Sequence, residues 1–149
     1  MNIEWICKKF NELVPYELYA IMQLRNEVFV VEQNCIYQDA DNKDISSWHF
    51  MGWENKKLAA YVRILPPGLS YAEASIGRVV TSPLYRRTGV GRLLMLNAIA
   101  ETQKQFNTTS IKIGAQLYLK KFYESLGFKQ CSELYMEDGI EHIEMIRHS

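Results

Sequence analysis

The sequence predicts a three-layer α/β or α+β domain, with helices on both faces of a mixed, mostly antiparallel sheet of about six or seven strands. Segments rich in β-branched and aromatic residues alternate along the chain with segments whose apolar residues recur at helical spacing. Because this alternation keeps no regular β-α-β rhythm, a mixed sheet is favoured over an all-parallel one. A chain of 149 residues that is 48% hydrophobic can bury one core, so we expect residues 1–149 to form a single domain.

In the first half of the chain, a strand is predicted over residues 3–10 and a long amphipathic helix over residues 15–33. The acidic, turn-rich segment 39–44 follows, and we interpret it as a solvated loop rather than a substrate site. Residues 48–53 and 58–65 have the alternation of two strands that are joined as a hairpin.

Residues 74–81 are predicted to form a further strand, which Pro83 ends. Alternation along this strand places Arg78 on the same face as Ile76 and Val80. An unpaired charge inside a protein is costly, so we expect Arg78 to be buried with a carboxylate partner rather than to act in catalysis.

The second half of the chain predicts two more helices with a strand between them. Residues 90–106 are apolar on more than one side, which is typical of a helix packed between a sheet and other elements. Residues 109–116 alternate as a strand, in which Gly114 marks a bulge or a close backbone approach. A short helix is predicted over residues 118–126, with Gly127 as its left-handed cap.

A hairpin is predicted at the end of the chain. Residues 128–136 and 140–146 have strand character, and Glu137, Asp138 and Gly139 form the turn between them. No internal repeat, low-complexity tract or linker interrupts the sequence, which agrees with a single domain.

The composition argues against several classes of protein. Seventeen basic and seventeen acidic residues cancel, so the overall charge expected of a nucleic-acid-binding protein is missing. No apolar run approaches the roughly 18 residues that span a bilayer, and the N-terminus lacks the features of a signal peptide. We therefore expect a cytoplasmic protein without nucleic-acid or membrane partners.

The cysteines and histidines indicate neither a disulfide framework nor a metal site. The cysteines are widely separated, form no C-x-x-C pair and are expected to be reduced thiols. The histidines show no metal-ligand spacing such as H-E-x-x-H, so no metal is expected. These residues are Cys7, Cys35, Cys131, His49, His142 and His148.

A cationic turn with two glycines precedes the helix predicted over residues 90–106. The turn is Arg86-Arg87-Thr88-Gly89-Val90-Gly91-Arg92. The first turn of a helix has backbone N–H groups without intrahelical partners and a partial positive charge, so it suits an anion. Gly89 and Gly91 let these N–H groups approach a bulky phosphate, and the arginines add charge around it. We therefore predict a phosphate-binding site.

Two common nucleotide-binding loops do not fit this turn. A Walker loop needs G-x-x-x-x-G-K-S/T, and no glycine in the chain is followed by Lys-Ser or Lys-Thr. The dinucleotide motif G-x-G-x-x-G begins at Gly89 and Gly91, but Leu94 takes the place of the third glycine. In addition, no acidic residue follows about 20 residues later in another predicted strand.

Two motifs of this chain occur together in a known superfamily. Arg86-Arg87-Thr88-Gly89-Val90-Gly91 fits Q/R-x-x-G-x-G/A, and Tyr123 stands four residues before Gly127 and Phe128. In this structural order the two motifs resemble the GNAT superfamily of N-acetyltransferases. Further segments are similar to the ElaA-like subgroup, namely residues 24–33, 77–79, 115–119 and 137–142.

The resemblance implies that acetyl-coenzyme A is the cosubstrate and that the fourth and fifth strands splay apart around its pantetheine arm. Backbone N–H groups of the glycine turn would bind the pyrophosphate, Gly114 fits the splay, and Gln116 stands where many members have an asparagine. The residues that the resemblance implies for the donor are Val79, Val80, Thr81, Arg86, Arg87, Thr88, Gly89, Val90, Gly91, Arg92, Gln116, Tyr118, Phe122 and Tyr123.

Tyr123 is the candidate proton donor to the leaving thiolate. A phenol with a pKa of about 10 can protonate a thiolate whose conjugate acid titrates at about 8.5, provided that it lies within hydrogen-bond reach. A tyrosine packed in the core is the alternative interpretation. A backbone N–H near Val80 would polarise the thioester carbonyl. The candidate bases are Glu27, Glu32, Glu73, His49 and His142, of which Glu32 and His142 lie in subgroup-like stretches.

The expected activity is direct transfer of an acetyl group from acetyl-coenzyme A to a primary amine. Two alternatives stay open. One is an acyltransferase like the acyl-homoserine-lactone synthases, suggested by residues 24–29 and the acidic loop after them, and the other is a non-catalytic coenzyme A sensor. The acceptor, a small-molecule or peptide amine, is not determined by the sequence, and we expect a monomer or a homodimer.

Overall fold

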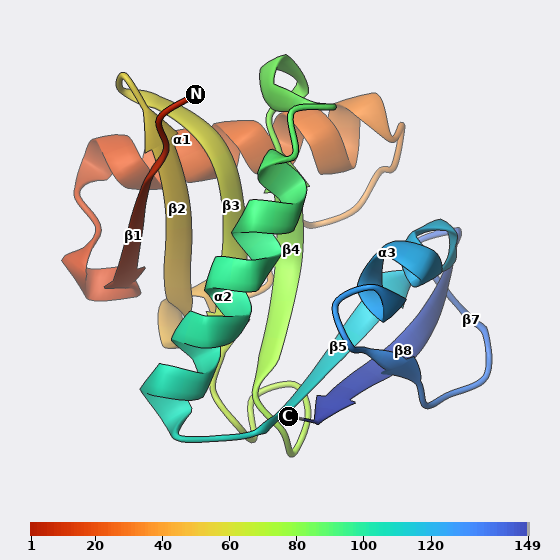
Figure 1. The fold of residues 1–149 in the computed structure, drawn as a ribbon. Coiled ribbons are helices and arrows are strands. Elements are labelled where there is room, and N and C mark those ends of the chain that lie inside the picture. The colour runs from red at the N-terminus through yellow and green to blue at the C-terminus, as the bar shows by residue number, and fades with distance from the viewer. Residues whose placement is uncertain (149) are drawn as a thin grey trace.

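The computed structural model describes residues 1–148, which form a layered arrangement of strands and helices (Figure 1). The elements are β1 (Glu4–Lys9), α1 (Pro15–Arg25), β2 (Trp48–Glu54), β3 (Lys57–Leu65), β4 (Ser75–Thr81), α2 (Val90–Phe106), β5 (Ser110–Gln116), α3 (Lys120–Glu124), β6 (Lys129–Gln130), β7 (Tyr135–Glu137) and β8 (Ile140–His148). None of the helices within residues 1–148 is long and apolar enough to cross a membrane.

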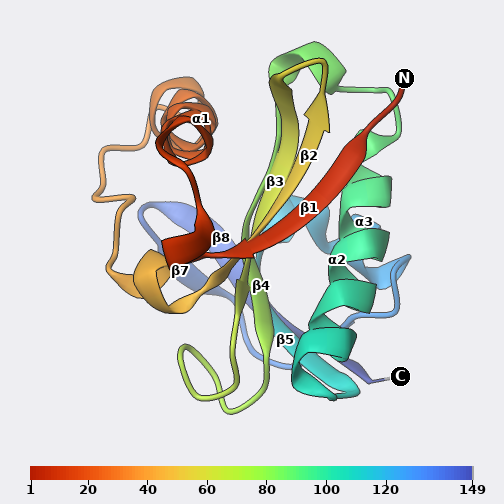
Figure 2. The ribbon, with the colours of Figure 1, turned by 90° about the vertical axis from the view of Figure 1, so that its left-hand side faces the viewer.

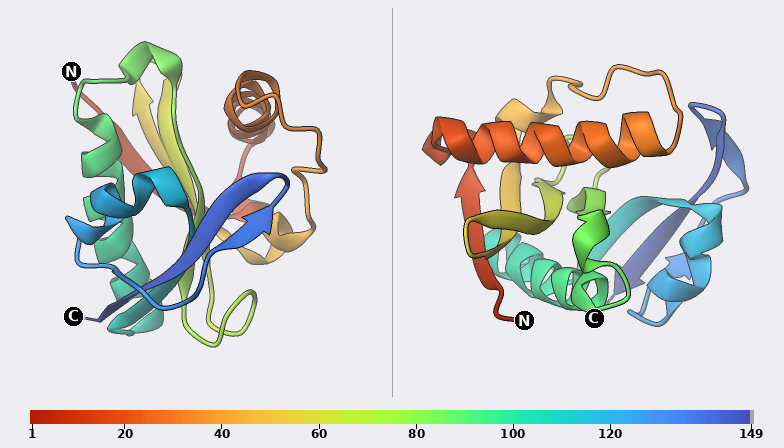
Figure 3. Two further views of the ribbon diagram at one scale, coloured as in Figure 1. Left: turned by 90° about the vertical axis from the view of Figure 1, so that its right-hand side faces the viewer. Right: turned by 90° about the horizontal axis from the view of Figure 1, so that it is seen from above.

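The strands form two antiparallel sheets, which divide between the fourth and fifth strands, where the predicted sheet was expected to splay. The first has the order β1-β2-β3-β4 and the second the order β5-β8-β6, with β7 also paired to β8. The sheets meet at a parallel bridge between Ala74 and Ile111, where the N–H of Lys112 donates to the carbonyl of Ala74 at 2.9 Å. Beyond this bridge β4 and β5 diverge, which confirms the expected splay. Figure 3, seen from above, shows β5 and β8 turning away from the sheet that contains β1 and β2.

Helices cover both faces of the first sheet, as predicted. Figure 2 shows α1 on one side and α2 and α3 on the other. On the α1 side, Ile21 and Leu24 pack with Met51 and Tyr61 of the sheet. The larger cluster on the α2 side joins both sheets, and includes Phe50, Val62, Ile64, Leu94, Met95, Ile99, Ile113, Tyr123, Ile143 and Met145.

A bulge in β4 changes which face its side chains occupy. The register between β3 and β4 shifts between Tyr61 and Arg63, and Arg78 has a φ of 50°, in the left-handed region. As a result Ile76 packs on the α2 side and Val80 on the α1 side, so the prediction that they share a face with Arg78 was wrong. The extra residue of a bulge reverses the alternation beyond it.

The helix predicted over residues 15–33 is present but changes its geometry. After α1 it continues as a π-helix over Asn26–Glu32, and the π pattern extends as the N–H of Cys35 donates to the carbonyl of Val30 at 3.0 Å. At its start the N–H of Val14 donates to the carboxylate of Glu17 at 2.9 Å. Because π-turns are frequent at functional sites, the side chains of this segment are candidates for the functional site.

The end of the chain departs from the predicted hairpin in one respect. Residues 128–136 do not form one strand: β6 and β7 pair with separate parts of β8. Between them the N–H of Cys131 donates to the carbonyl of Glu144, and Ser132 Oγ accepts from the N–H of Glu144 at 2.8 Å. The turn itself is confirmed, with Asp138 and Gly139 at φ of 51° and 77°.

Candidate active site

A cleft of about 860 Å³ lies where β4 and β5 diverge, with further walls from the π-helical segment, α3 and the β7–β8 hairpin. Most of the predicted donor-binding residues line this cleft: Val79, Val80, Thr81, Arg86, Gly91, Gln116, Tyr118, Phe122 and Tyr123. His142 lines it as well. The remaining predicted residues do not line it: Arg87, Thr88, Gly89, Val90, Arg92 and Glu32.

The glycine turn has the geometry of an anion site at the start of α2. Arg87 and Gly89 have φ of 63° and 85°, and a Cβ at Gly89 would meet no atom within 4 Å. The N–H of Leu93 donates to the carbonyl of Gly89 at 3.2 Å, so the N–H groups before it have no intrahelical carbonyl to bond. These free donors and the helix dipole together favour a phosphate at the mouth of the cleft.

The arginines of this turn are held by neighbouring elements. Arg86 Nη1 donates to Glu32 Oε2 at 2.8 Å, and Arg86 Nη2 donates to the other carboxylate oxygen. Arg92 Nη1 donates to Ser125 Oγ at 2.9 Å. The hydrogen bond from Arg86 lowers the pKa of Glu32, which stays ionised. Glu32 was predicted as a base, but here both its oxygens serve to hold Arg86 at the rim of the cleft.

Tyr123 lies on α3 with its ring in the core and its hydroxyl at the cleft. The side chain is 4% exposed and contacts the rings of Phe122 and Phe128 edge-on, with centroid separations of 5.3 and 5.9 Å. Burial raises the pKa of Tyr123, so the phenol is fully protonated at neutral pH. Within residues 1–148 its hydroxyl has no hydrogen-bond partner, which leaves the proton available to a ligand in the cleft.

Gly114 allows two tyrosine hydroxyls to approach β5. The ladder between β5 and β8 is continuous, so the bulge considered for Gly114 is absent. A Cβ at this position would lie 2.9 Å from Tyr135 Oη and 3.1 Å from Tyr71 Oη. The close approach at Gly114 is therefore made by the side chains of Tyr71 and Tyr135 and not by another backbone segment. At the end of β5, Gln116 Nε2 lies 3.5 Å from Gln33 Oε1 and loosely connects β5 to the π-helical segment.

His142 is the histidine that faces the cleft, and its tautomer is fixed. Nδ1 lies 2.8 Å from the carbonyl of Ile140, which can only accept, so Nδ1 carries a proton. Nε2 lies 3.4 Å from Glu137 Oε2, and the ring stacks on Tyr135 at 5.8 Å. In the neutral ring Nε2 is thus the proton-accepting nitrogen, and the carboxylate of Glu137 lies beside it.

The other candidate bases lie elsewhere. Glu27 and Glu73 do not line the cleft. His49 is fully buried between Tyr61 Oη, at 2.7 Å from Nδ1, and the carbonyl of Asp44, at 2.9 Å from Nε2. Burial lowers the pKa of His49, so it is neutral and its ring nitrogens are both occupied. Its role is to connect β2, β3 and the acidic loop.

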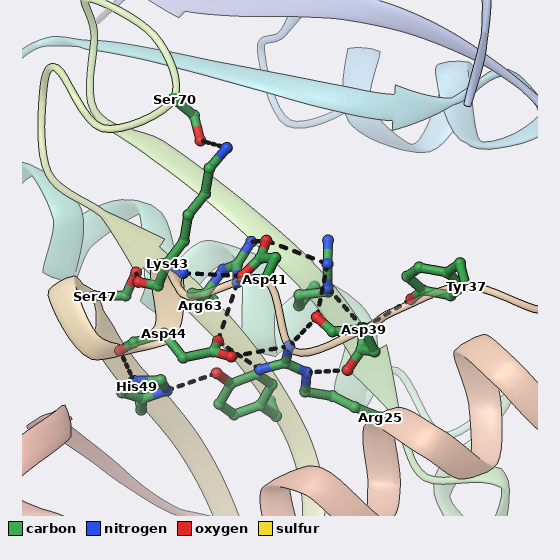
Figure 4. Close-up of polar contacts among 12 residues, drawn as sticks. Arg25, Tyr37, Asp39, Asp41, Lys43, Asp44, Ser47, His49, Arg63 and Ser70 are labelled. Carbon is green, nitrogen blue, oxygen red and sulfur yellow. Dashed lines mark hydrogen bonds and ion pairs between the residues drawn. The ribbon is translucent and has the colours of Figure 1, made fainter. Parts of the chain in front are cut away.

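The acidic segment 39–44 is part of a buried ionic cluster, so its interpretation as a solvated loop was wrong. Figure 4 shows Arg25, Arg63, Asp39, Asp41 and Asp44 converging. Arg78 completes the ionic cluster, because its Nε donates to Asp39 Oδ1 at 2.8 Å. Arg25 is fully buried, and Asp39 and Asp44 are 6% and 4% exposed. A signal was present in the sequence, since arginines within apolar stretches of α1 and β3 need carboxylate partners.

Short ion pairs hold the ionic cluster together. Arg25 Nε lies 2.8 Å from Asp39, and Arg25 Nη1 lies 2.7 Å from Asp44. Arg63 Nη1 lies 2.7 Å from Asp41 and 3.0 Å from Asp44. Burial alone would raise the pKa of Asp41, but the hydrogen bonds from Arg63 outweigh it and lower this pKa to about 2. Asp41, Arg63 and Arg78 also line the cleft, so the ionic cluster forms part of its wall.

Comparison with known proteins identifies the family. A family model described as an acetyltransferase (GNAT) domain matches residues 17–148. The crystal structure of an acyl-CoA N-acyltransferase from Pseudomonas aeruginosa is 40% identical, with a TM-score of 0.93 over 98% of this chain and 99% of that chain. The crystal structure of Escherichia coli ElaA is 42% identical, with a TM-score of 0.92 over 99% of this chain and 100% of that one. A UPF0039 protein of Schizosaccharomyces pombe is 43% identical over 97% of this chain and 96% of its own length. The chain therefore belongs to the GNAT acetyltransferase family and is an ElaA-like member of it.

Proposed function

We propose that this protein is an N-acetyltransferase that moves the acetyl group of acetyl-coenzyme A to a primary amine by direct attack. The observation that carries the proposal is that the glycine turn, the open edge of β4 and the Tyr123 hydroxyl all meet at one cleft. Each of the three suits a different part of an acyl-coenzyme A thioester, namely the pyrophosphate, the amide-bearing arm and the sulfur.

Two elements fit the donor. The first-turn N–H groups of α2, with Gly91 and Arg86 at the cleft, would bind the pyrophosphate. Within the described residues 1–148, β4 has no strand partner on its β5 side beyond Ala74. The backbone groups of Val79 and Thr81 can therefore pair with the amides of the pantetheine arm as they would with a strand.

The residues of the chain would then support one acyl transfer. The neutral amine nitrogen bonds to the thioester carbon, the C–S bond breaks, and the sulfur departs as a thiolate. A backbone N–H near Val80 would stabilise the oxyanion. Burial keeps the Tyr123 phenol protonated, so it would donate a hydrogen bond to the developing thiolate and pass its proton to the sulfur as the C–S bond breaks. The proton that the amine nitrogen loses on becoming an amide would then restore the phenol.

We assign the base to His142. The amine reaches the site as an ammonium ion and must lose a proton before it attacks. Nε2 of His142 is the ring nitrogen that carries no proton in the neutral ring, and it lies in the cleft 3.4 Å from Glu137. The alternative base, Glu32, is engaged by Arg86 and lies outside the lining.

Substitution of Tyr123 by phenylalanine tests the proposal. With acetyl-coenzyme A and a panel of primary amines, we expect Tyr123→Phe to lower kcat, measured as free thiol released, by about 100-fold. The affinity for acetyl-coenzyme A should stay unchanged, because only the hydroxyl is lost. Tyr16→Phe is the matched control, since Tyr16 is 86% exposed and outside the cleft.

Three results would contradict this assignment. Wild-type turnover in Tyr123→Phe would return Tyr123 to a packing role. Binding of acetyl-coenzyme A without turnover of any amine would indicate a sensor. Turnover with acyl-carrier-protein thioesters alone would indicate the acyl-homoserine-lactone type of chemistry.

A further inference from the structure

The cleft extends beyond the donor-binding residues to a second region with its own polar groups. One side of this acceptor region is formed by the acidic loop and β4, and the other by the β7–β8 hairpin. The hairpin side also contacts the segment after the π-helix, where Cys35 Sγ donates to the carbonyl of Asp138 at 3.3 Å. The lining residues that matter here are Lys43, Arg78, Glu137 and His142.

Arg78 presents an unused donor to the acceptor region. Its Nε donates to Asp39 Oδ1 at 2.8 Å, and its Nη2 donates to the carbonyl of Asp39 at 3.1 Å. Nη1 has no partner among residues 1–148, and the side chain is 22% exposed. The ring of Tyr37, 5.8 Å from Cζ, covers one face of the guanidinium and helps to fix its plane. The unused N–H groups are therefore both oriented and accessible.

The neighbouring carboxylate of Asp41 contacts Arg78 through Nη2, which lies 3.4 Å from Asp41 Oδ2, and not through Nη1. Asp41 already accepts from Arg63 with both oxygens, at 2.7 and 3.0 Å. The ionic cluster contains three arginines and three aspartates, so it is neutral as a whole. Lys43, whose Nζ donates to Ser70 Oγ at 2.9 Å at the exposed edge, adds one positive charge (Figure 4). One surplus charge with free N–H donors suits a monoanion better than a dianion.

The β7–β8 side of the acceptor region carries acidic side chains, whereas the other side carries Arg78 and Lys43. Glu137 has a side chain that is 59% exposed, and it lies 3.4 Å from the proton-accepting Nε2 of His142. Asp138 lines the same side. An ammonium ion is favoured next to these groups, whereas a carboxylate is favoured next to Arg78 and Lys43.

We propose that the acceptor is an amine that also carries a carboxylate, as an α-amino acid does. Its carboxylate would bind Arg78 Nη1 and Lys43, and its ammonium group would lie by Glu137 and His142. This inference rests on the proposed N-acetyltransferase function. It distinguishes such an acceptor from a peptide N-terminus, which has no carboxylate beside its amine.

Matched pairs of amines test the assignment. Phenylalanine with 2-phenylethylamine, leucine with 3-methylbutylamine and histidine with histamine differ only in the carboxylate. In each pair we expect kcat/KM with acetyl-coenzyme A to be at least about tenfold higher for the amino acid, the effect of one charged hydrogen bond. O-phosphoethanolamine with ethanolamine tests a dianion in the same way, and a short peptide with a free N-terminus tests that class.

Substitutions at Arg78 and Lys43 test whether these two residues cause the preference for an amine that carries a carboxylate. Arg78→Gln and Lys43→Gln should each reduce the preference, measured as the ratio of kcat/KM for the amino acid to kcat/KM for its plain amine, about tenfold. Arg78→Lys keeps a cation and should retain part of the preference, which covers the case in which Arg78→Gln does not fold. Lys57→Gln, an exposed lysine outside the cleft, is the control.

The outcomes separate this inference from the proposed function. Equal rates within each pair, or a preference that survives both Arg78→Lys and Lys43→Gln undiminished, would overturn the carboxylate assignment alone. Faster turnover of the peptide or of O-phosphoethanolamine than of every amino acid would overturn it too. No turnover of any amine, although acetyl-coenzyme A binds in calorimetry, would overturn the proposed function and this inference together.

Discussion

Arg25 is the residue on which the position of the acidic loop depends most. Its fully buried guanidinium makes four hydrogen bonds to Asp39 and Asp44. Removal of one member of a buried ion pair leaves the other charges unpaired, so we expect Arg25→Met to lower the free energy of unfolding by about 3–5 kcal/mol in urea titrations. Lys8→Met is the control, because the side chains of the Lys8–Glu17 pair are 30% and 13% exposed and the pair should contribute at most about 1 kcal/mol. Equal losses in the two variants would contradict the special role of Arg25.

Asp41 predicts a dependence of stability on acid pH. Its pKa is about 2 in the folded protein, below the value of about 3.9 expected in the unfolded chain. Its stabilisation is therefore complete above about pH 4 and is lost as the pH falls towards about 2. Solvent reaches this half-buried pair, so the contribution is on the order of 1 kcal/mol. In urea unfolding at a series of pH values, Asp41→Asn should be less stable than the wild type at neutral pH and equal to it near pH 2. A constant difference at every pH would refute this.

Among the secondary-structure elements, the start of α2 allows the effect of a charge on coenzyme A binding to be tested separately from the effect of backbone conformation. Gly89 has a φ of 85°, which asparagine and aspartate tolerate better than other residues do. Gly89→Asn and Gly89→Asp should therefore fold alike. A carboxylate beside the pyrophosphate should weaken coenzyme A binding in calorimetry by about tenfold or more, whereas the amide should weaken it by less than about threefold. Equal effects of the two variants would argue against a phosphate at this turn.

Elements governed by local sequence were predicted well, and those governed by distant contacts were not. The span of α2 and the turn at Gly139 follow from apolar spacing and glycine, which act over a few residues. The bulge at Arg78 was missed because alternation cannot reveal an inserted residue whose partner lies on β3. The change to π geometry after Arg25 was missed for a similar reason, since the apolar spacing of the two helix types is too alike over seven residues.

The candidate active site shows the same difference between residues in contiguous motifs and residues joined by distant contacts. The glycine turn and Tyr123 were found because their motifs are contiguous, and most of the residues inferred from them line the cleft. Asp39 and Asp44 were read as a solvated loop, since their arginine partners lie 14 to 39 positions away in the chain. Only the fold brings these charges together.

At the scale of the whole molecule, the two sheets share a core and, within residues 1–148, are joined by one backbone bridge. Ala74 and Ile111 are joined at one end, and the opposite end is separated by the cleft. A ligand that pairs with the edge of β4 would replace the strand contacts that are missing there. The unliganded protein should therefore open most readily along this edge, where its backbone groups are unpaired.

If the donor binds along the edge of β4, it should both stabilise the folded protein and protect that edge from hydrogen exchange. Acetyl-coenzyme A at about 100 times its Kd should raise the free energy of unfolding by about 2.7 kcal/mol, or Tm by about 5–10 °C for a domain of this size. Hydrogen exchange at Val79 and Thr81 should slow at the same time. Adenosine 3′,5′-bisphosphate, which lacks the pantetheine arm, should raise Tm without protecting β4, and Gly89→Asp should diminish both effects of the donor. Stabilisation by acetyl-coenzyme A with no added protection along β4 would show that the arm does not lie between the two sheets.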